Sequence, residues 1–108
     1  METLRNKLNT LKLTLFTKKV LLALVDIPLG QVRSYAQIAT IVGQPGAARA
    51  VGSVCKNNPF PVTIPCHRVV PSKFLSTHSR QDIGNYSCVG GVKKKIALLL
   101  KEGVKVVD

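Results

Sequence analysis

Acidic side chains are scarce in this sequence. It holds five Asp and Glu residues against 16 Lys and Arg residues, which gives its 108 residues a formal charge of +11. This imbalance indicates a polyanionic partner, and nucleic acid is the first candidate. A basic surface without such a partner, as in some thermophile proteins, would also explain the charge.

Long apolar runs are missing too. No run approaches the roughly 18 residues of a membrane-spanning helix, and no basic amphipathic helix shows an aromatic face. The sequence therefore favours nucleic acid over a membrane as the partner. The length predicts one domain, since repeats, low-complexity tracts and obvious linkers are absent as well.

Cysteines are few and odd in number. Cys55, Cys66 and Cys88 show no C-x-x-C spacing, so the sequence predicts neither a disulfide framework nor a zinc site. No signal peptide is visible. We therefore expect a reducing compartment, either cytoplasmic (nucleoid-associated) or nuclear.

Apolar residues at helical spacing predict a first helix from about Thr14, ended by Pro28. Its inward face would hold Phe16, Val20, Ala23, Leu24 and Ile27. Residues 1–15 show no clear period and are expected to form only an N-terminal stub, with the domain itself at 16–108.

A second helix is predicted from Tyr35 to Val42. The spacing of Ser34 and Gln37 is that of a capping box, and Gly43 suits a left-handed C-cap. A third helix follows from near Pro45 to about Lys56. Two short helices joined by a turn that contains Gly make a candidate helix-turn-helix.

The third predicted helix is nearly bare. Arg49 is the only long side chain in its first half, among the small residues Ala47, Ala48, Ala50, Gly52 and Ser53. A bare helix permits close approach either to another helix or to a narrow DNA groove. Composition alone favours helix packing.

The β-branched run from Val62 to Ile64 is stopped by Pro65, which predicts that Cys66 stands where a short strand ends. Nearby positive charge from His67 and Arg68 favours the nucleophilic thiolate of Cys66. Adjacent residues of a strand face opposite ways, so His67 would act on Cys66 through a backbone bend or a bridging water. Cys66 as a buried small apolar residue is the alternative.

The segment Ile64-Pro65-Cys66-His67-Arg68-Val69-Val70 resembles the active-site signature of the O6-alkylguanine-DNA alkyltransferases (methylated-DNA:protein-cysteine methyltransferases). Further segments stand at the spacing of that family, and the resemblance runs from Phe16 to Val104. These segments are Ala47-Ala48-Arg49-Ala50-Val51-Gly52, Asn58-Pro59, Gly84-Asn85-Tyr86-Ser87 and Leu98-Leu99-Leu100-Lys101-Glu102-Gly103.

The resemblance implies a mainly α-helical, winged-helix-like DNA-binding domain with a helix-turn-helix and a short β element. It also implies that the α/β domain which usually precedes it in the family is absent. The implied activity is DNA repair, the irreversible transfer of an alkyl group from O6 of a flipped-out guanine in double-stranded DNA to a cysteine. No metal or other cofactor is implied, and we expect a monomer.

The implied catalytic roles fall on five residues. Cys66 accepts the alkyl group, and His67 acts as its base through a water molecule. Glu102 orients His67, although an acid in a last helical turn could equally be an exposed partner of Lys101. Asn58 braces the reactive turn, and Tyr35 crowds the 3′ phosphate and donates towards N3 of the guanine.

The implied DNA-binding residues lie mostly on the bare helix, which would enter the minor groove. Arg49 fills the gap left by the flipped nucleotide. Backbone contacts are expected from Arg33, Lys56 and Arg68. The whole set is completed by Ser34, Ala47, Ala48, Ala50 and Gly52.

The stretch from Pro71 to Tyr86 is longer than the loop expected from the family. The resemblance places Tyr86 on the wall of the alkylguanine pocket and the backbone N–H of Ser87 at O6, although Cys88 and Val89 are extra residues there. His78 is expected to be simply solvated.

A last helix is predicted from Gly91 to Gly103, followed by a closing strand at 104–107. Its inward residues would be Val92, Ile96, Leu99 and Leu100, with Lys93, Lys94 and Lys95 outward.

Two alternatives remain open. An alkyltransferase-like sensor would bind alkylated DNA without transfer, but such proteins typically carry Trp at the position of Cys66. A plain helix-turn-helix regulator would leave Asn58, Cys66, His67 and Glu102 without a role.

Overall fold

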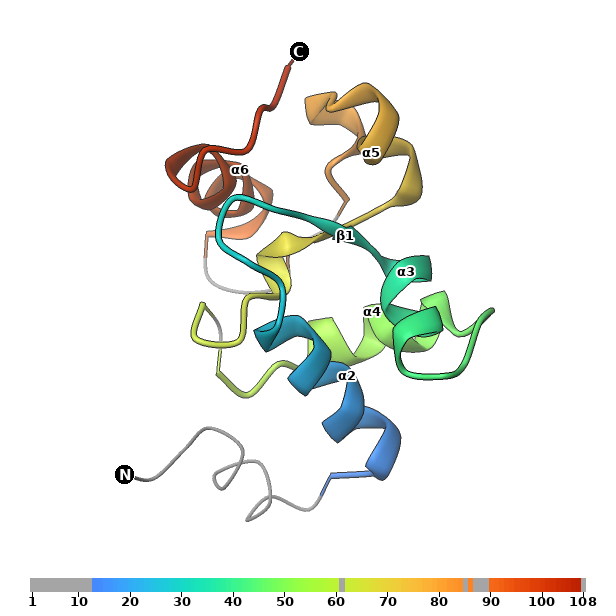
Figure 1. Ribbon diagram of the computed structural model, residues 1–108. Coiled ribbons are helices and arrows are strands. Elements are labelled where there is room, and N and C mark those ends of the chain that lie inside the picture. Colours follow the sequence, from blue (N-terminus) through green and yellow to red (C-terminus); the bar gives the residue numbers. More distant parts are fainter. Residues whose placement is uncertain (1–12, 61, 85, 87–89, 108) are drawn as a thin grey trace.

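The computed structural model describes residues 13–60, 62–84, 86 and 90–107. This part of the chain is mainly helical with a two-stranded sheet, as predicted (Figure 1). In chain order the elements are α2 (Leu15–Val25), β1 (Arg33–Ser34), α3 (Tyr35–Ile41), α4 (Ala48–Lys56), the 3-10 helix η1 (Cys66–Arg68), β2 (Val69–Val70), α5 (Ser72–Thr77), the 3-10 helix η2 (Arg80–Asp82) and α6 (Gly91–Lys101).

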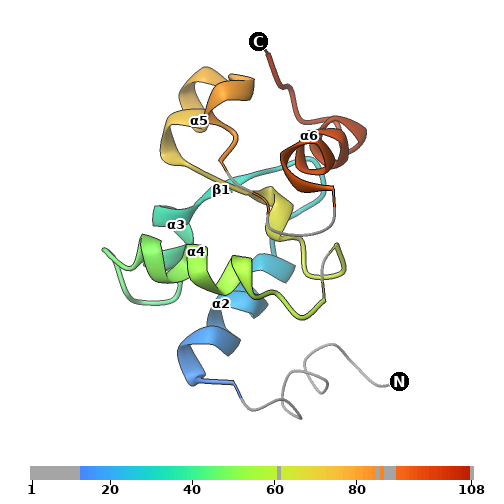
Figure 2. The same cartoon turned by 180° about the vertical axis from the view of Figure 1, so that it is seen from behind.

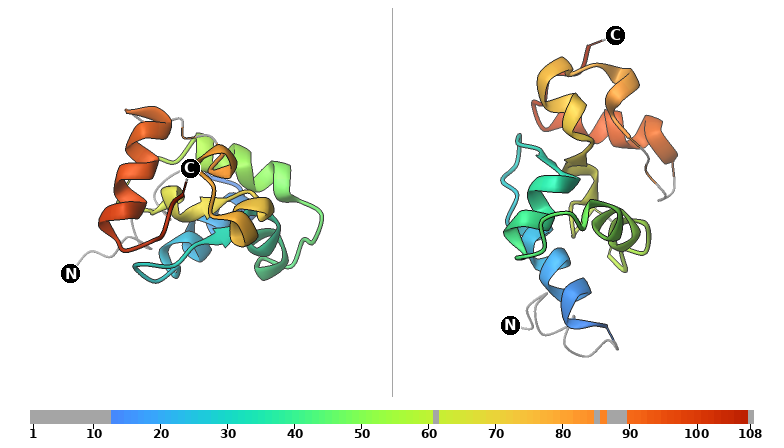
Figure 3. Two further views of the ribbon diagram at one scale, coloured as in Figure 1. Left: turned by 90° about the horizontal axis from the view of Figure 1, so that it is seen from above. Right: turned by 90° about the vertical axis from the view of Figure 1, so that its right-hand side faces the viewer.

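Helices α2, α3 and α4 gather at one end of the molecule, while α5 and α6 lie at the other end (Figure 2; Figure 3, right). Two groups of buried side chains follow this division. The first is formed largely by Val20, Leu21, Leu24, Ile38, Ala39, Val51 and Val54. The second consists of Val70, Phe74, Ile83, Ile96, Leu99 and Val104.

The predicted helix-turn-helix is present as α3 and α4, and its capping box is confirmed. Ser34 Oγ accepts from the backbone N–H of Gln37 at 3.0 Å, and Gln37 Oε1 accepts from the N–H of Ser34 at 2.8 Å. Gly43 has a φ of 83°, the left-handed conformation predicted for it. These contacts fix where α3 begins and therefore where Tyr35 stands.

The two strands pair in parallel, with Arg33 opposite Val69 and Ser34 opposite Val70. This pairing brings the start of α3 next to the chain that follows Cys66. The predicted strand at Val62–Ile64 is wrong, because Val62 and Thr63 form a turn, Ile64 makes only an isolated β-bridge, and the strand comes after the cysteine instead.

The turn is explained by its hydrogen bonds. The N–H of Ile64 donates back to the carbonyl of Phe60 at 2.8 Å, which reverses the chain over four residues. Val62 takes a φ of 71°, rare for a β-branched residue. Hydrogen bonds to residues just outside the run therefore override its strand preference.

The stretch after β2 is largely structured, since it forms α5 and η2. His78 is not simply solvated as expected: its Nδ1 lies 2.9 Å from the carbonyl oxygen of Lys105, and its ring lies 5.0 Å from that of Phe74. The predicted closing strand is reduced to one parallel bridge between Ser79 and Val107.

The inward face of α6 differs from the prediction. Ile96 and Leu99 are buried as expected, but Val92 and Leu100 are exposed and Lys95 is fully buried. The inward-facing residues of α6 are thus Lys95, Ile96 and Leu99, so that a lysine side chain faces the interior of the protein. Within the residues described here, no helix combines the length and apolar character needed to cross a bilayer.

Candidate active site

A cavity of about 520 Å³ opens between the helix-turn-helix and the segment around Cys66. Several residues predicted for the site border it: Tyr35, Ala48, Arg49, Gly52, Lys56, Cys66 and Tyr86. Its other lining residues are Ser53, Cys55, Pro71 and Gly84. The structure therefore brings these predicted residues together around one cavity.

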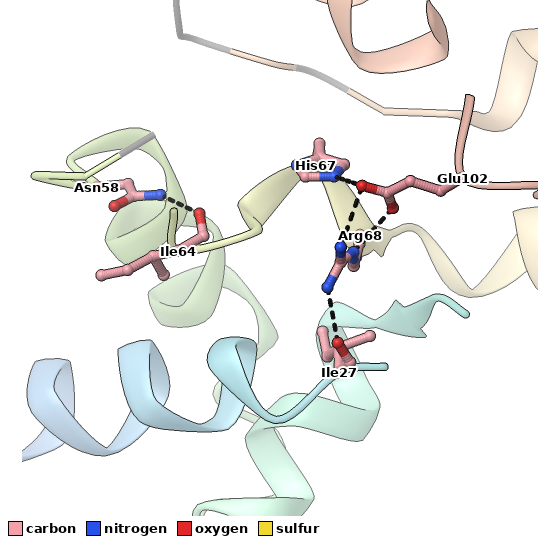
Figure 4. A network of polar contacts seen from close by, with 6 residues as sticks. All are labelled: Ile27, Asn58, Ile64, His67, Arg68 and Glu102. Atoms are coloured by element: carbon pink, nitrogen blue, oxygen red, sulfur yellow. Dashed lines mark hydrogen bonds and ion pairs between the residues drawn. The ribbon is translucent and has the colours of Figure 1, made fainter. Parts of the chain in front are cut away.

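Cys66 begins η1 rather than ending a strand. Its N–H donates to the carbonyl of Ile64 at 2.8 Å, and the side-chain amide of Asn58 donates to the same carbonyl at 2.8 Å (Figure 4). Asn58 Oδ1 also accepts from the N–H of Phe60 at 2.9 Å. The buried side chain of Asn58 thus holds together, by two hydrogen bonds, the turn that precedes Cys66. Cys66 itself is 4% exposed.

His67 follows Cys66 in η1 and is fully buried. Its Nε2 is 2.8 Å from Oε2 of Glu102 (Figure 4). An ionised carboxylate can only accept, so Nε2 donates and the lone pair of the neutral ring lies on Nδ1. Within the described part of the chain, Nδ1 makes no hydrogen bond. The basic atom of His67 is therefore the one turned away from Glu102.

Both members of this pair have shifted pKa values. Burial lowers the pKa of His67, and the hydrogen bond and charge of Glu102 offset this only in part. Burial acts to raise the pKa of Glu102, but hydrogen bonds from Arg68 and His67 outweigh it and lower the pKa. At neutral pH the pair is a neutral imidazole bonded to a carboxylate.

Arg68 also binds the carboxylate of Glu102. Its Nε and Nη2 donate to the two oxygens of Glu102 at 2.8 and 3.1 Å, and its Nη1 donates to the carbonyl of Ile27 at 2.8 Å. Such a bidentate pair is geometrically specific. The guanidinium that was expected to contact the DNA backbone is engaged inside the protein instead.

Tyr35 is the first residue of α3. Burial, with smaller contributions from the thiolates of Cys55 and Cys66, raises its pKa to about 12. Its hydroxyl therefore stays protonated at neutral pH and can donate a hydrogen bond.

Ala50, Gly52 and Ser53 of α4 are not covered by another helix of the described structure, whereas Ala47 packs against the first group of buried side chains. Arg49 and Ala50 are exposed, and a Cβ built on Gly52 would have no heavy atom within 4 Å among the described residues. Val51 and Val54 face the core instead. The bare face of α4 is thus open and continuous with the cavity.

Other predicted residues lie apart from the cavity lining. Ala47 is the N-cap of α4 and makes no side-chain cap hydrogen bond. Ser34 is buried in its capping box, and the guanidinium of Arg33 donates to Val32 and Gln31. Ser87 lies outside the described residues.

Two residues near the cavity were missed by the sequence analysis. Cys55 borders it, and Nζ of Lys95 lies 6.0 Å from the ring centroid of Tyr35. An odd cysteine on a helix gives no functional signal, and Lys95 is one of three consecutive lysines.

Known proteins match most of this chain. The model of the 6-O-methylguanine DNA methyltransferase DNA binding domain matches residues 15–104. The chain is 46% identical over 89 residues to the human methylated-DNA–protein-cysteine methyltransferase, covering 82% of the chain and 39% of that relative. It is also 46% identical over 86 residues to the Mycobacterium leprae protein of the same name, covering 80% and 47%.

Solved structures agree with these matches. A crystal structure of Mycobacterium tuberculosis OGT in complex with DNA has a TM-score of 0.74 and 40% identity, over 85% of this chain and 51% of that one. S. pombe Atl1 in complex with DNA containing O6-carboxymethylguanine has a TM-score of 0.67 and 33% identity, over 88% and 82%. The chain spans about two fifths of the human relative, and it belongs to the family of the 6-O-methylguanine DNA methyltransferase DNA binding domain.

Proposed function

We propose that this chain repairs double-stranded DNA directly, by taking the alkyl group of O6-alkylguanine onto Sγ of Cys66, once per molecule. One observation carries the proposal: Cys66 borders a cavity while its neighbour His67 is bonded to Glu102 at 2.8 Å. These contacts support a reaction in which Cys66 is the nucleophile and His67, oriented by Glu102, is its base.

The reaction begins with removal of the thiol proton. Nδ1 of the neutral His67 takes it through a water molecule, and Glu102 stabilises the imidazolium that forms. The thiolate then attacks the alkyl carbon, the S–C bond forms, and the C–O6 bond breaks with its electron pair going to the guanine. Tyr35 donates a hydrogen bond towards N3 as the base gains charge. A thioether has no easy reversal, so each molecule reacts once.

Access to O6 requires that the nucleotide leave the base stack. The bare face of α4 suits entry into the minor groove, because small side chains allow close approach of the helix. Arg49 borders the cavity and is exposed, so it can occupy the gap that the flipped nucleotide leaves. The formal charge of +11 supplies attraction to the phosphates without sequence preference.

The test is the mass of the intact protein after incubation with duplex DNA containing O6-methylguanine, followed by peptide mapping. The expected result is a gain of one methyl group on Cys66, with stoichiometry no greater than one. Cys66→Ser should remove the gain and retain DNA binding. Repair that survives this substitution would contradict the proposal.

A second candidate is lesion recognition without transfer. It is favoured by the likeness to S. pombe Atl1, which this chain covers over 82% of its length. Tight binding to the lesion with no gain of mass at Cys66 would select this candidate.

A further inference from the structure

Arg68 connects segments that lie far apart in the sequence. Its Nε and Nη2 donate to Oε1 and Oε2 of Glu102 at 2.8 and 3.1 Å, and its Nη1 donates to the carbonyl of Ile27 at 2.8 Å (Figure 4). A Cβ built on Gly30 would lie 3.1 Å from the backbone oxygen of Glu102, so the turn after α2 also packs against this residue. The side chains of Arg68 and Glu102 are 14% and 12% exposed. Three hydrogen bonds thus fix the guanidinium between α6 and the turn.

Both oxygens of Glu102 are occupied. Oε2 accepts from Nε2 of His67 at 2.8 Å and from Nη2 of Arg68 at 3.1 Å, while Oε1 accepts from Nε of Arg68 at 2.8 Å. An uncompensated carboxylate beside an imidazole favours the imidazolium, because opposite charges attract. Here the guanidinium already compensates the carboxylate. The hydrogen bond to Glu102 can therefore orient the ring of His67 without holding a second proton on it.

We propose that Arg68 is a positioning residue of the transfer to Cys66, an inference that rests on the function proposed above. Its guanidinium fixes the Glu102 carboxylate against Nε2 of His67, and its charge keeps the ring neutral. Only the neutral ring has a lone pair on Nδ1 that can accept the thiol proton. Arg68 is not among the residues that line the cavity, so it acts through Glu102 and His67 rather than on the substrate.

The charges that face His67 come from η1 and α6. Burial has the largest effect and lowers the pKa of His67, Glu102 raises it, and the charges of Arg68 and Lys95 lower it. Lys95, with a pKa of about 8, keeps its charge below about pH 7. Glu102, whose pKa is lowered from 4.5, stays ionised above about pH 5.5. Between these limits both charges are constant, so removal of Arg68 should move the titration of His67 to higher pH.

Heteronuclear NMR of the histidine rings in the native chain tests this effect and needs no DNA. The chain has two histidines, and His78→Gln assigns their signals. In the wild type we expect His67 as the Nε2–H tautomer with a titration midpoint below 6.5. In Arg68→Met, which removes the charge and keeps an unbranched apolar stem, the midpoint should move to higher pH. The same shift is expected when Cys66→Ser is added to both proteins, which excludes the neighbouring thiol as its source.

Two further variants separate the charge of Arg68 from its geometry. Lys101→Met is the matched control, because Lys101 is exposed and precedes Glu102 in the sequence. It should leave the midpoint of His67 nearly unchanged. Arg68→Lys keeps the positive charge but loses the planar fork that binds both carboxylate oxygens. Its midpoint should stay close to that of the wild type.

Single-turnover transfer from duplex DNA containing O6-methylguanine measures the consequence for the reaction. The ratio of the rates at about pH 7.5 and about pH 6 should be about twofold or more larger in Arg68→Met than in the wild type, because more of His67 is protonated at the lower pH. Arg68→Lys should keep the wild-type ratio but react about threefold or more slowly at both pH values, since an ammonium fixes the carboxylate less well.

Three results would overturn the proposal: a wild-type midpoint of His67 above 6.5, an unchanged midpoint in folded Arg68→Met, or wild-type transfer rates in Arg68→Lys. The first and third do not depend on whether Arg68→Met folds. A wild-type chain that transfers nothing to Cys66 would contradict the proposed function. The titration of His67 would still show whether Arg68 controls the state of the ring.

Discussion

Glu102 and His67 are bonded at 2.8 Å although they are 35 positions apart in the sequence. The pair joins the C-terminal end of α6 to the segment that presents Cys66. Because the carboxylate also binds Arg68, it is fixed from two sides. The carboxylate at the end of α6 thus orients His67, the base of the proposed reaction.

Glu102→Gln should slow methyl transfer to Cys66 by about 10-fold to 100-fold, because a neutral amide stabilises an imidazolium poorly and does not impose one tautomer. DNA affinity should change little, since Glu102 lies away from the cavity lining. Single-turnover transfer rates and fluorescence anisotropy measure the two effects. Lys101→Gln is the control one residue away, and an equal loss of rate there would argue against the role of Glu102.

Acid should destabilise the folded protein through the same pair. The pKa of His67 is lowered from 6.5 and that of Glu102 from 4.5, so the unfolded chain binds more protons than the folded one as the pH falls through these values. The free energy of unfolding should therefore decrease steadily below about pH 6.5. Urea unfolding at a series of pH values measures this. In Glu102→Gln the free energy of unfolding should decrease less steeply at the more acidic pH values, because the carboxylate that would take up a proton there is absent.

Asn58→Ala should lower the free energy of unfolding by about 1–3 kcal/mol, because it leaves the partly buried N–H of Phe60 without its acceptor and removes the second donor to the buried carbonyl of Ile64. The neighbouring Asn57 is exposed, and within the described part of the chain its side chain bonds only to the carbonyl of Ser53 in the preceding helix. Asn57→Ala is therefore the control, with an expected change within about 0.5 kcal/mol. Equal effects in urea unfolding would show that Asn58 is not a specific brace.

The sequence predicted the helices best where local chemistry decides them. The capping box of Ser34 and Gln37 and the Gly43 cap are interactions between residues close in the chain, so α3 could be placed in advance. The run from Val62 to Ile64 was misjudged because the side chain of Asn58, which lies outside the run, favours a turn there. Lys95 was placed outward because its burial depends on segments distant in the sequence, since α6 packs against η1 and Nζ of Lys95 lies near Tyr35 and Gly84.

In the candidate site too, the residues of a local motif could be predicted, while contacts between distant segments could not. Cys66 and His67 were found through a contiguous motif, and Glu102 through the family resemblance, since an acid near a helix end gives no signal of its own. Arg68 was expected at the DNA backbone, but its partners Glu102 and Ile27 come from distant segments. Such pairings could not be predicted from local spacing.

Arg49→Ala should separate base flipping from simple phosphate binding. If Arg49 fills the gap in the duplex, the transfer rate should fall about tenfold or more while the salt dependence of DNA binding stays close to that of the wild type. A phosphate contact would instead lower the salt slope by about one. Lys19→Ala, which removes an exposed charge on α2, serves as the control for charge alone.

Gly52 offers the sharpest test of how α4 is used. Open space surrounds the position in the described structure, so Gly52→Ala should fold and gain about 0.5–1 kcal/mol of stability from its higher helix propensity. Gly52→Leu should also fold, because the space around the Cβ position is open in the described structure and Gly52 borders the cavity. If α4 enters a narrow groove, however, the leucine should weaken binding to duplex DNA about tenfold or more, with alanine intermediate. Fluorescence anisotropy and thermal unfolding measure both properties on the same variants. Undiminished DNA affinity of a folded Gly52→Leu protein would place the DNA on another face and require a different route for the base to reach Cys66.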